Sequence, residues 1–361
     1  MKHRLVLALV VLVLVPLLIT FRVSSTPSAS APSPTAAITD TSETSLRSLA
    51  QKRGINIGAA VAMEPFYKDA TYRKVLAREF NVLVPENAMK FAEIHPKRHQ
   101  YNFTQVDTLV AFAKAHDMQV RGHPLVWHYS LPNWLEKGNF TRDELKEILR
   151  EHIQTVVGRY RGQIPAWDIA NEVVTRDGSF VDSIWLREIG PEYLDLAFRW
   201  AHEADPKARL YYNEYSAEDM SDKSDAVYNL ANGMLQRGVP IHGIGLQMHK
   251  LVSWSLVSSV AENIKRIGKI GLEVSITEMD ISIAEGTGSR EERLAKQAQI
   301  YGDMMRVCVA APHCKTFAMW GFTDRYTWAT SWLGTEGAPL IFDESYRPKA
   351  SYKAIEEALK S

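Results

Sequence analysis

Two glutamates in this chain follow short apolar segments, where a carboxylate is costly unless it is paired or reactive. Glu172 follows the apolar segment 165–171, and Glu278 follows the segment 272–277. A purely structural glutamate would more often lie on a solvated helix face. Two carboxylates in this setting indicate paired-carboxylate chemistry, provided that the fold brings them together.

The elements that must position these glutamates alternate between short β-branched runs and longer amphipathic runs. Strands are predicted over residues 55–61, 81–85, 119–127, 165–170, 208–212, 241–247, 272–277 and 315–320. The helices between and after them are predicted over 67–79, 106–116, 142–160, 192–203, 223–237, 256–267, 290–309 and 350–359. Eight strand–helix units favour an α/β fold of the (β/α)8 TIM-barrel type. A doubly wound open sheet is the alternative, but it gives no reason for eight units.

Polar or aromatic side chains occur at the same end of seven predicted strands. In a barrel that end forms a single face, and active sites lie on it. The residues are Glu86, Asn87, Lys90, His123, Trp127, His128, Asn171, Glu172, Asn213, Gln247, His249, Glu278, Asp280, Trp320 and Trp328. One such residue would be expected by chance, whereas seven strands with them predict a substrate cleft.

The histidines and the lysine of this set each have a structural alternative. His123, His128 and His249 could hold a metal, but the chain has no His-Glu-x-x-His segment, so core or substrate contacts are favoured. Lys90 could pair with Glu86 as a structural bridge or hydrogen-bond a ligand hydroxyl. We therefore expect no metal site.

The tryptophans could be core residues, but Trp127, Trp320 and Trp328 stand beside carboxylates, which favours a platform for sugar rings. The chain has no Gly-x-Gly-x-x-Gly after the first strand and no P-loop, so no nucleotide cofactor is expected. Paired glutamates without a cofactor fit glycoside hydrolysis. A carboxyl separation of about 5–5.5 Å would mean retention of configuration, and about 6.5–9.5 Å inversion.

Composition and the N-terminal residues indicate which partners to expect and where the catalytic domain is located. Basic and acidic side chains number 42 each, so nothing in the net charge points to nucleic acid. Residues 1–23 combine a basic start with an apolar run over 5–19, which predicts a signal peptide or, alternatively, a signal anchor. Residues 24–45 are rich in Ser, Thr, Pro and Ala and are predicted to be a disordered linker. The catalytic domain, 46–361, is expected outside the cell, and it would meet a membrane only if the N-terminal segment stays uncleaved.

The chain has two cysteines, Cys308 and Cys314, which is too few for a thiolate metal site. They could be two inert buried thiols. They could also close a small disulfide loop, if this part of the protein meets an oxidising compartment.

The strand-end motifs resemble those of glycoside hydrolase family 10, the endo-β-1,4-xylanases. The matching segments are 85–90, 122–128, 167–172, 212–215, 243–249, 276–280, 320–324 and 339–343. They occur in order, at barrel spacing, over nearly all of the folded part. The resemblance implies a secreted, retaining endo-β-1,4-xylanase that acts on xylan and xylo-oligosaccharides, and we expect a monomer.

The resemblance also implies roles for individual residues. Glu172 would be the general acid/base and Glu278 the nucleophile. Asn171 would hold the sugar 2-hydroxyl, and His249, oriented by Asp280, would hydrogen-bond the nucleophile. Further substrate contacts would come from Glu86, Asn87, Lys90, His123, Trp127, Asn213, Gln247, Trp320 and Trp328. The cysteines match a pair found in secreted members, which favours the disulfide.

Departures from the family pattern concern fine specificity rather than the reaction. Glu214 stands where Asp is common, and Phe91 where Trp is common. A related barrel glycanase acting on cellulose or mixed-linkage glucan remains an alternative. A non-catalytic xylan-binding barrel is another, but such proteins typically lose a catalytic carboxylate, and both are present here.

Overall fold

The computed structural model describes residues 45–329 and 337–361. The predictions for residues 1–44 lie outside this range. Ser45, which was assigned to the linker, is buried and caps the first helix, because its hydroxyl accepts a hydrogen bond from the Ser48 N–H. Among the described residues, no helix combines the length and apolar character needed to cross a membrane.

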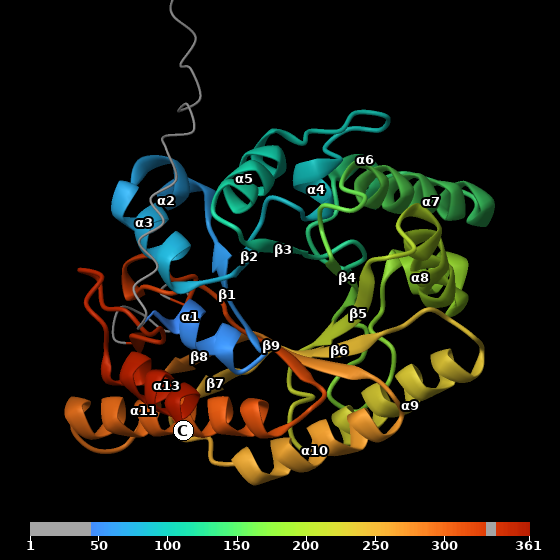
Figure 1. The fold of residues 1–361 in the computed structure, drawn as a ribbon. Helices are drawn as coiled ribbons and strands as arrows, with labels where there is room; N and C mark the ends of the chain where they lie inside the picture. The colour runs from blue at the N-terminus through green and yellow to red at the C-terminus, as the bar shows by residue number, and fades with distance from the viewer. Residues whose placement is uncertain (1–44, 330–336) are drawn as a thin grey trace, which may run out of the picture. The chain divides into compact units, whose positions relative to one another are not determined.

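The strands of the described residues form a closed parallel barrel, as predicted (Figure 1). They are β1 (Asn56–Val61), β2 (Val82–Pro85), β3 (Gln119–Gly122), β4 (Ala166–Asn171), β5 (Arg209–Glu214), β6 (Gly243–Leu246), β7 (His249–Leu251), β8 (Glu273–Ser282) and β9 (Cys314–Met319). The sheet closes because β6 pairs with both β5 and β8, while β7 pairs with the far end of β8. The architecture is therefore a (β/α)8 barrel.

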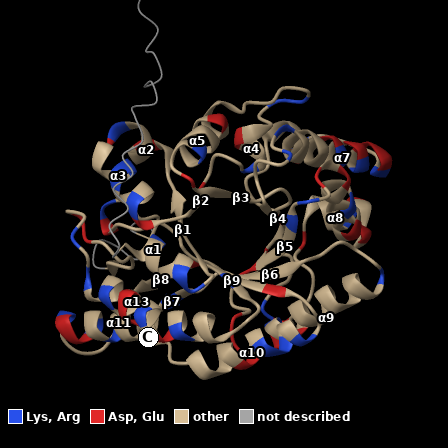
Figure 2. Cartoon of the chain, in the orientation of Figure 1, with Lys and Arg blue, Asp and Glu red and all other residues tan. Residues whose placement is uncertain are grey.

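Helices surround the barrel, and Figure 2 shows residues of both charge signs along α7, α10 and α11. They are α1 (Leu46–Lys52), α2 (Met63–Lys68), α3 (Ala70–Glu79), α4 (Phe91–Ile94), α5 (Thr104–Ala115), α6 (Asn133–Glu136), α7 (Arg142–Arg159), α8 (Glu192–Ala204), α9 (Asp222–Gln236), α10 (Val257–Lys269), α11 (Arg290–Ala310) and α13 (Ala350–Lys360). A π-helix spans Trp185–Ile189, and a short 3-10 helix spans Asp324–Tyr326. A capping box formed by Thr141 and Glu144 begins α7.

Three predicted boundaries were wrong, each for a local reason. The helix expected over 67–79 is divided between α2 and α3, because the Asp69 carboxylate accepts the first N–H groups of α3. The strand expected over 119–127 ends at Gly122, since Pro124 has no N–H for the ladder. The strand expected over 272–277 continues to Ser282, because β7 pairs with its second half.

One contact between neighbouring strands of the barrel requires glycine. A Cβ at Gly122 would stand 2.0 Å from a ring carbon of Trp167, which is fully buried. Glycine at this position of β3 therefore makes room for the indole of Trp167 on the neighbouring strand β4. Trp167 is thus a packing residue, which leaves the end of β4 free to carry the site.

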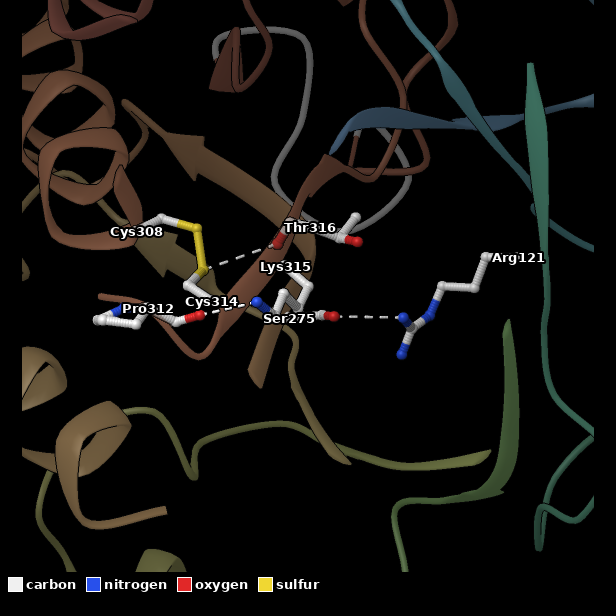
Figure 3. The surroundings of a disulfide bond; sticks show 7 residues. All are labelled: Arg121, Ser275, Cys308, Pro312, Cys314, Lys315 and Thr316. Carbon is white, nitrogen blue, oxygen red and sulfur yellow. Dashed lines mark hydrogen bonds between the residues drawn. A yellow bond between two sulfur atoms is a disulfide. The ribbon is translucent and has the colours of Figure 1, made fainter. Parts of the chain in front are cut away.

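A disulfide ties the last turn of α11 to the first residue of β9. Figure 3 shows the bond between Cys308 and Cys314, with Lys315 and Thr316 of β9 beside it. Both cysteines are buried, and the link closes a short loop that holds Pro312, whose carbonyl accepts a hydrogen bond from the Lys315 ammonium. The disulfide therefore fixes the connection between α11 and the barrel strand β9.

Candidate active site

Glu172 lies directly after β4 in a backbone conformation that few side chains adopt. Its φ is +55°, and its N–H donates to the carbonyl of Asn213 at the end of β5 at 3.0 Å. Its carboxylate accepts hydrogen bonds from the Trp127 indole at 3.0 Å and the Gln247 amide at 3.1 Å. Glu172 is half-buried. Its carboxyl group is therefore oriented by these hydrogen bonds and is still accessible to a ligand.

Glu278 lies within β8 rather than past its end, because this strand is longer than predicted. Only 5% of its surface is exposed. One carboxylate oxygen accepts a hydrogen bond of 2.6 Å from the Asn213 amide, and the other lies 3.2 Å from His249 Nε2. His123 Nε2 lies 4.0 Å from the same carboxylate. The nucleophile predicted from the sequence is therefore a buried carboxylate surrounded by nitrogen donors.

Three side-chain amides connect the two glutamates. Asn171 Oδ1 accepts from the Asn213 amide at 2.8 Å and lies 3.4 Å from the Gln247 amide. Because Asn213 also donates to Glu278 and Gln247 donates to Glu172, a continuous hydrogen-bonded path joins the two carboxylates. All three amides are almost fully buried. The ends of β4, β5, β6 and β8 thus form one polar constellation.

The surroundings of Glu278 keep it ionised. Burial alone would raise its pKa, but the hydrogen bond from His249, the nearby charge of His123 and the Asn213 amide outweigh burial and lower the pKa below its ordinary value. Burial would conversely lower the pKa of His249, yet Asp280 and Glu278 raise it well above the ordinary value. Asp280 Oδ2 lies 2.9 Å from His249 Nδ1. His249 is therefore a cation held between two carboxylates.

Two tryptophans pack against the residues that surround Glu278. The Trp328 indole donates to Asp280 at 2.7 Å, and its ring stands edge-on to His249 with 5.1 Å between centroids. Trp320 lies edge-on to His123 at 5.1 Å and is 9% exposed. These contacts place both rings beside Glu278.

The polar residues that follow β2 form a second group near Glu172. The Lys90 ammonium donates to Asn87 at 2.6 Å, and the Asn87 amide donates to Glu86 at 3.1 Å. The ammonium also lies 5.2 Å from the centre of the Trp127 ring. Burial lowers the pKa of Lys90, although Glu86, Glu278 and Glu172 all oppose this change. Lys90 is thus linked to Glu86 through Asn87 and to the acid/base candidate through Trp127.

The sequence analysis missed a buried ion pair that orients one of the histidines. Arg121 of β3 and Asp168 of β4 are bonded at 2.5 Å, and Asp168 Oδ2 lies 2.9 Å from His123 Nδ1. Burial would raise the pKa of Asp168, but the charge of Arg121 and the bond to His123 lower it. A charged residue within each apolar strand was the available signal. Their pairing depends on the register of β3 and β4.

His128, predicted among the strand-end residues, lies beside Trp127, with 6.1 Å between ring centroids. Burial lowers its pKa, although Glu172 opposes the change. Within 45–329 and 337–361, no three His, Cys, Asp or Glu side chains are arranged to hold a metal ion. The site therefore consists of two carboxylates, their amide and histidine partners, and aromatic walls.

Comparison with known proteins identifies the class of protein that this fold and site define. Residues 45–358 match the model of glycosyl hydrolase family 10, and the chain belongs to this family.

Relatives of known name agree with this assignment. The chain is 44% identical over 318 residues to endo-1,4-beta-xylanase B of Thermotoga neapolitana, covering 87% of this chain and 91% of the relative. It is 40% identical to a beta-1,4-xylanase of Dictyoglomus thermophilum, covering 83% and 87%. Among solved structures, native xylanase 10B of Thermotoga maritima matches with a TM-score of 0.85 and 44% identity, covering 88% of this chain and 98% of the other.

Proposed function

We propose that this protein is a retaining endo-β-1,4-xylanase that cleaves internal bonds of xylan, with Glu278 as nucleophile and Glu172 as general acid/base. The observation that carries the proposal is the difference between the surroundings of the two carboxylates. Glu278 is buried and held ionised by His249, His123 and Asn213, whereas Glu172 is more accessible. A double displacement requires this difference.

In the first step, a Glu278 oxygen attacks the anomeric carbon and the bond to the leaving sugar's oxygen breaks. Glu172 gives its proton to that oxygen, and an ester links the sugar to Glu278. In the second step, Glu172 takes a proton from water, the water oxygen bonds to the anomeric carbon, and the ester bond breaks. The charge of Glu278 disappears in the ester and returns on hydrolysis.

Asn171 supplies a donor for the sugar in this mechanism. Its amide oxygen already accepts from Asn213 and Gln247, so its amide nitrogen is the atom left to hydrogen-bond a substrate hydroxyl. Such a donor stabilises the transition state more than the ground state when the bond tightens as positive charge develops on the sugar. Glu86, Asn87 and Lys90 would bind the next sugar along.

Xylan is favoured over glucans because the named relatives are xylanases and because Trp320 and Trp328 crowd the region of Glu278. A glucose unit carries a hydroxymethyl group that xylose lacks. Hydrolysis of xylan should therefore far exceed that of carboxymethylcellulose under the same conditions. Comparable rates on both polymers would favour the glucanase alternative.

The residue roles are tested by two alanine variants and a surface control. Glu278→Ala should abolish turnover, and added azide should restore part of it and give the inverted glycosyl azide. Glu172→Ala should reduce cleavage of xylan by about 10²–10⁴-fold but spare aryl xylosides with good leaving groups. Glu147→Ala, on the exposed face of α7, should change neither activity. An α-anomer as the first product in NMR would refute retention.

We also infer that the catalytic domain is exported through residues 1–23, followed by the linker 24–45. The basic and apolar start of the chain supports this, and so does the Cys308–Cys314 disulfide, since disulfides persist in oxidising compartments. Cell fractionation with N-terminal sequencing distinguishes a cleaved signal from an uncleaved anchor. We also propose that the protein is a monomer, which light scattering would test.

A further inference from the structure

Two buried glutamates near the end of β5 bond to the segments next to Glu172 and His249. Glu214 is the last residue of β5, and Glu218 follows in the loop that leads to α9. Their exposed fractions are 0% and 1%. From the sequence, Glu214 was noted as a departure from the family pattern but given no role, and Glu218 was not noted. An ionised carboxylate is expensive to bury, so the bonds that each one makes show what it serves.

Glu214 bonds to the segment that follows the acid/base. Its Oε2 accepts from the Val174 N–H at 3.2 Å, and its Oε1 accepts from the Tyr215 N–H at 3.1 Å. Lys223, with 3% of its side chain exposed, forms an ion pair with Oε1 at 2.9 Å. The Lys223 ammonium also lies 3.3 Å from the centre of the Tyr215 ring. Glu214 thereby ties the chain two residues beyond Glu172 to β5 and α9.

Glu218 bonds to the segment that precedes the histidine of the nucleophile. Its Oε1 accepts from the Met248 N–H at 2.9 Å and from the Ser216 N–H at 3.1 Å. Its Oε2 forms an ion pair with Lys250 at 2.6 Å. Met248 and Lys250 are the neighbours of His249 on either side. Glu218 thereby fixes the short strand β7, from which His249 contacts Glu278.

Both glutamates act next to strained backbone. Glu172 has φ of +55° and Met248 has φ of +69°. A left-handed conformation costs a non-glycine residue about 1–2 kcal/mol, so the surrounding bonds must hold it in place. The N–H groups captured by Glu214 and Glu218 lie two residues after Glu172 and at Met248 itself. Glu218 therefore holds the backbone at Met248 itself, and Glu214 holds the backbone two residues after Glu172.

We propose that Glu214 and Glu218 are positioning residues for opposite halves of the reaction, Glu214 for proton donation by Glu172 and Glu218 for the His249–Glu278 nucleophile. This inference rests on the proposed function of the two catalytic glutamates. Glu214 and Glu218 thus have different roles, although both are buried glutamates with a lysine partner. If Glu214 and Glu218 had a purely structural role, their removal would affect proton donation and nucleophilic attack equally.

The experiment uses the full chain and removes both charges of each pair, so that no buried lysine is left unpaired. The variants are Glu214→Gln with Lys223→Met, and Glu218→Gln with Lys250→Met. For each, kcat/KM is measured on xylan oligosaccharides and on a dinitrophenyl xylobioside. The aryl substrate needs no proton donor. The ratio of the two kcat/KM values is independent of the fraction of enzyme that is folded.

The Glu214 variant should lose about tenfold or more on the oligosaccharide but less than about threefold on the aryl substrate, since proton donation contributes about 10²–10⁴-fold. The Glu218 variant should lose about tenfold on both, with the ratio unchanged within about twofold. Each variant thus serves as the matched control of the other. Equal losses on both substrates in both variants would overturn the inference.

Conservative variants give a second test if the double variants accumulate poorly. Glu214→Asp and Glu218→Asp keep the charge but shorten the reach to Val174 and Met248. They should show the same division between substrates with a smaller effect of about threefold, and two unchanged ratios would contradict the inference. A wild-type enzyme that cleaves neither substrate would instead refute the proposed function, so the two failures are distinguishable.

Discussion

Two pairs of histidines in this protein have opposite surroundings in the fold. His123 and His249 face Glu278, and each has a carboxylate at its second nitrogen. His95 and His152 are fully buried among aromatic rings beneath the segment that carries Lys90, and their ring nitrogens have no hydrogen-bond partners. Phe91 stacks against both rings, with its centroid 3.7 Å from His152 and 5.4 Å from His95.

The difference shows that partners, rather than burial, decide the charge of a histidine. Asp280 and Glu278 raise the pKa of His249 despite burial, whereas burial lowers the pKa of His95 to about 4 and that of His152 well below its ordinary value. His249 can therefore stabilise an anion. His95 and His152 behave as neutral aromatic packing under the segment that carries Lys90.

The strongest expected effect concerns the carboxylate behind His123. Asp168→Asn should lower the free energy of unfolding by about 3–5 kcal/mol, because Arg121 would remain buried without its counter-charge. Asp107→Asn is the control, since its ion pair with Arg159 is exposed and should cost less than about 1 kcal/mol. Urea unfolding of both variants measures the difference. Similar losses would show that burial does not distinguish these pairs.

A smaller effect is expected on activity when a charged histidine is removed. His249→Ala should reduce kcat/KM on xylan by about 10²–10³-fold, because the nucleophile loses a charged donor. His152→Leu should keep activity within about twofold, as its ring contacts only packing residues. Initial rates at neutral pH test the pair, and a loss below tenfold for His249→Ala would contradict the proposed role of this residue.

The smallest effect concerns the pH dependence of stability. The folded pKa of His95 lies below that of the unfolded chain, so the unfolded state binds more protons between about pH 6.5 and 4, and stability falls as the pH falls through this window. Wild type should therefore lose up to about 3 kcal/mol more than His95→Leu between pH 7 and 4.

Urea unfolding at several pH values checks this last prediction. His249 should behave in the opposite sense, because its raised pKa gives stability that is present below about pH 6.5 and is lost as the pH rises through the folded value. Parallel stability curves for wild type and His95→Leu would show that His95 is not the buried neutral base described above.

Much of the site could be predicted because strand ends have a sequence signal. Short apolar runs predicted the barrel, and the polar residues after them included both catalytic candidates. Helix breaks were less predictable, since Asp69 interrupts a helical pattern only by capping the next helix. The division into β6 and β7 was missed because three residues make too short a strand to show periodicity.

The sequence by itself determined the barrel, the two glutamates and the family motifs, because these depend on local periodicity and on residue types at fixed spacing. Only the tertiary structure decided which residues became partners. The Arg121–Asp168–His123 group and the bonds from Glu214 and Glu218 join residues far apart in the chain. Their pairing follows from strand register and loop geometry, where a shift of one residue would exchange a buried partner for an exposed one.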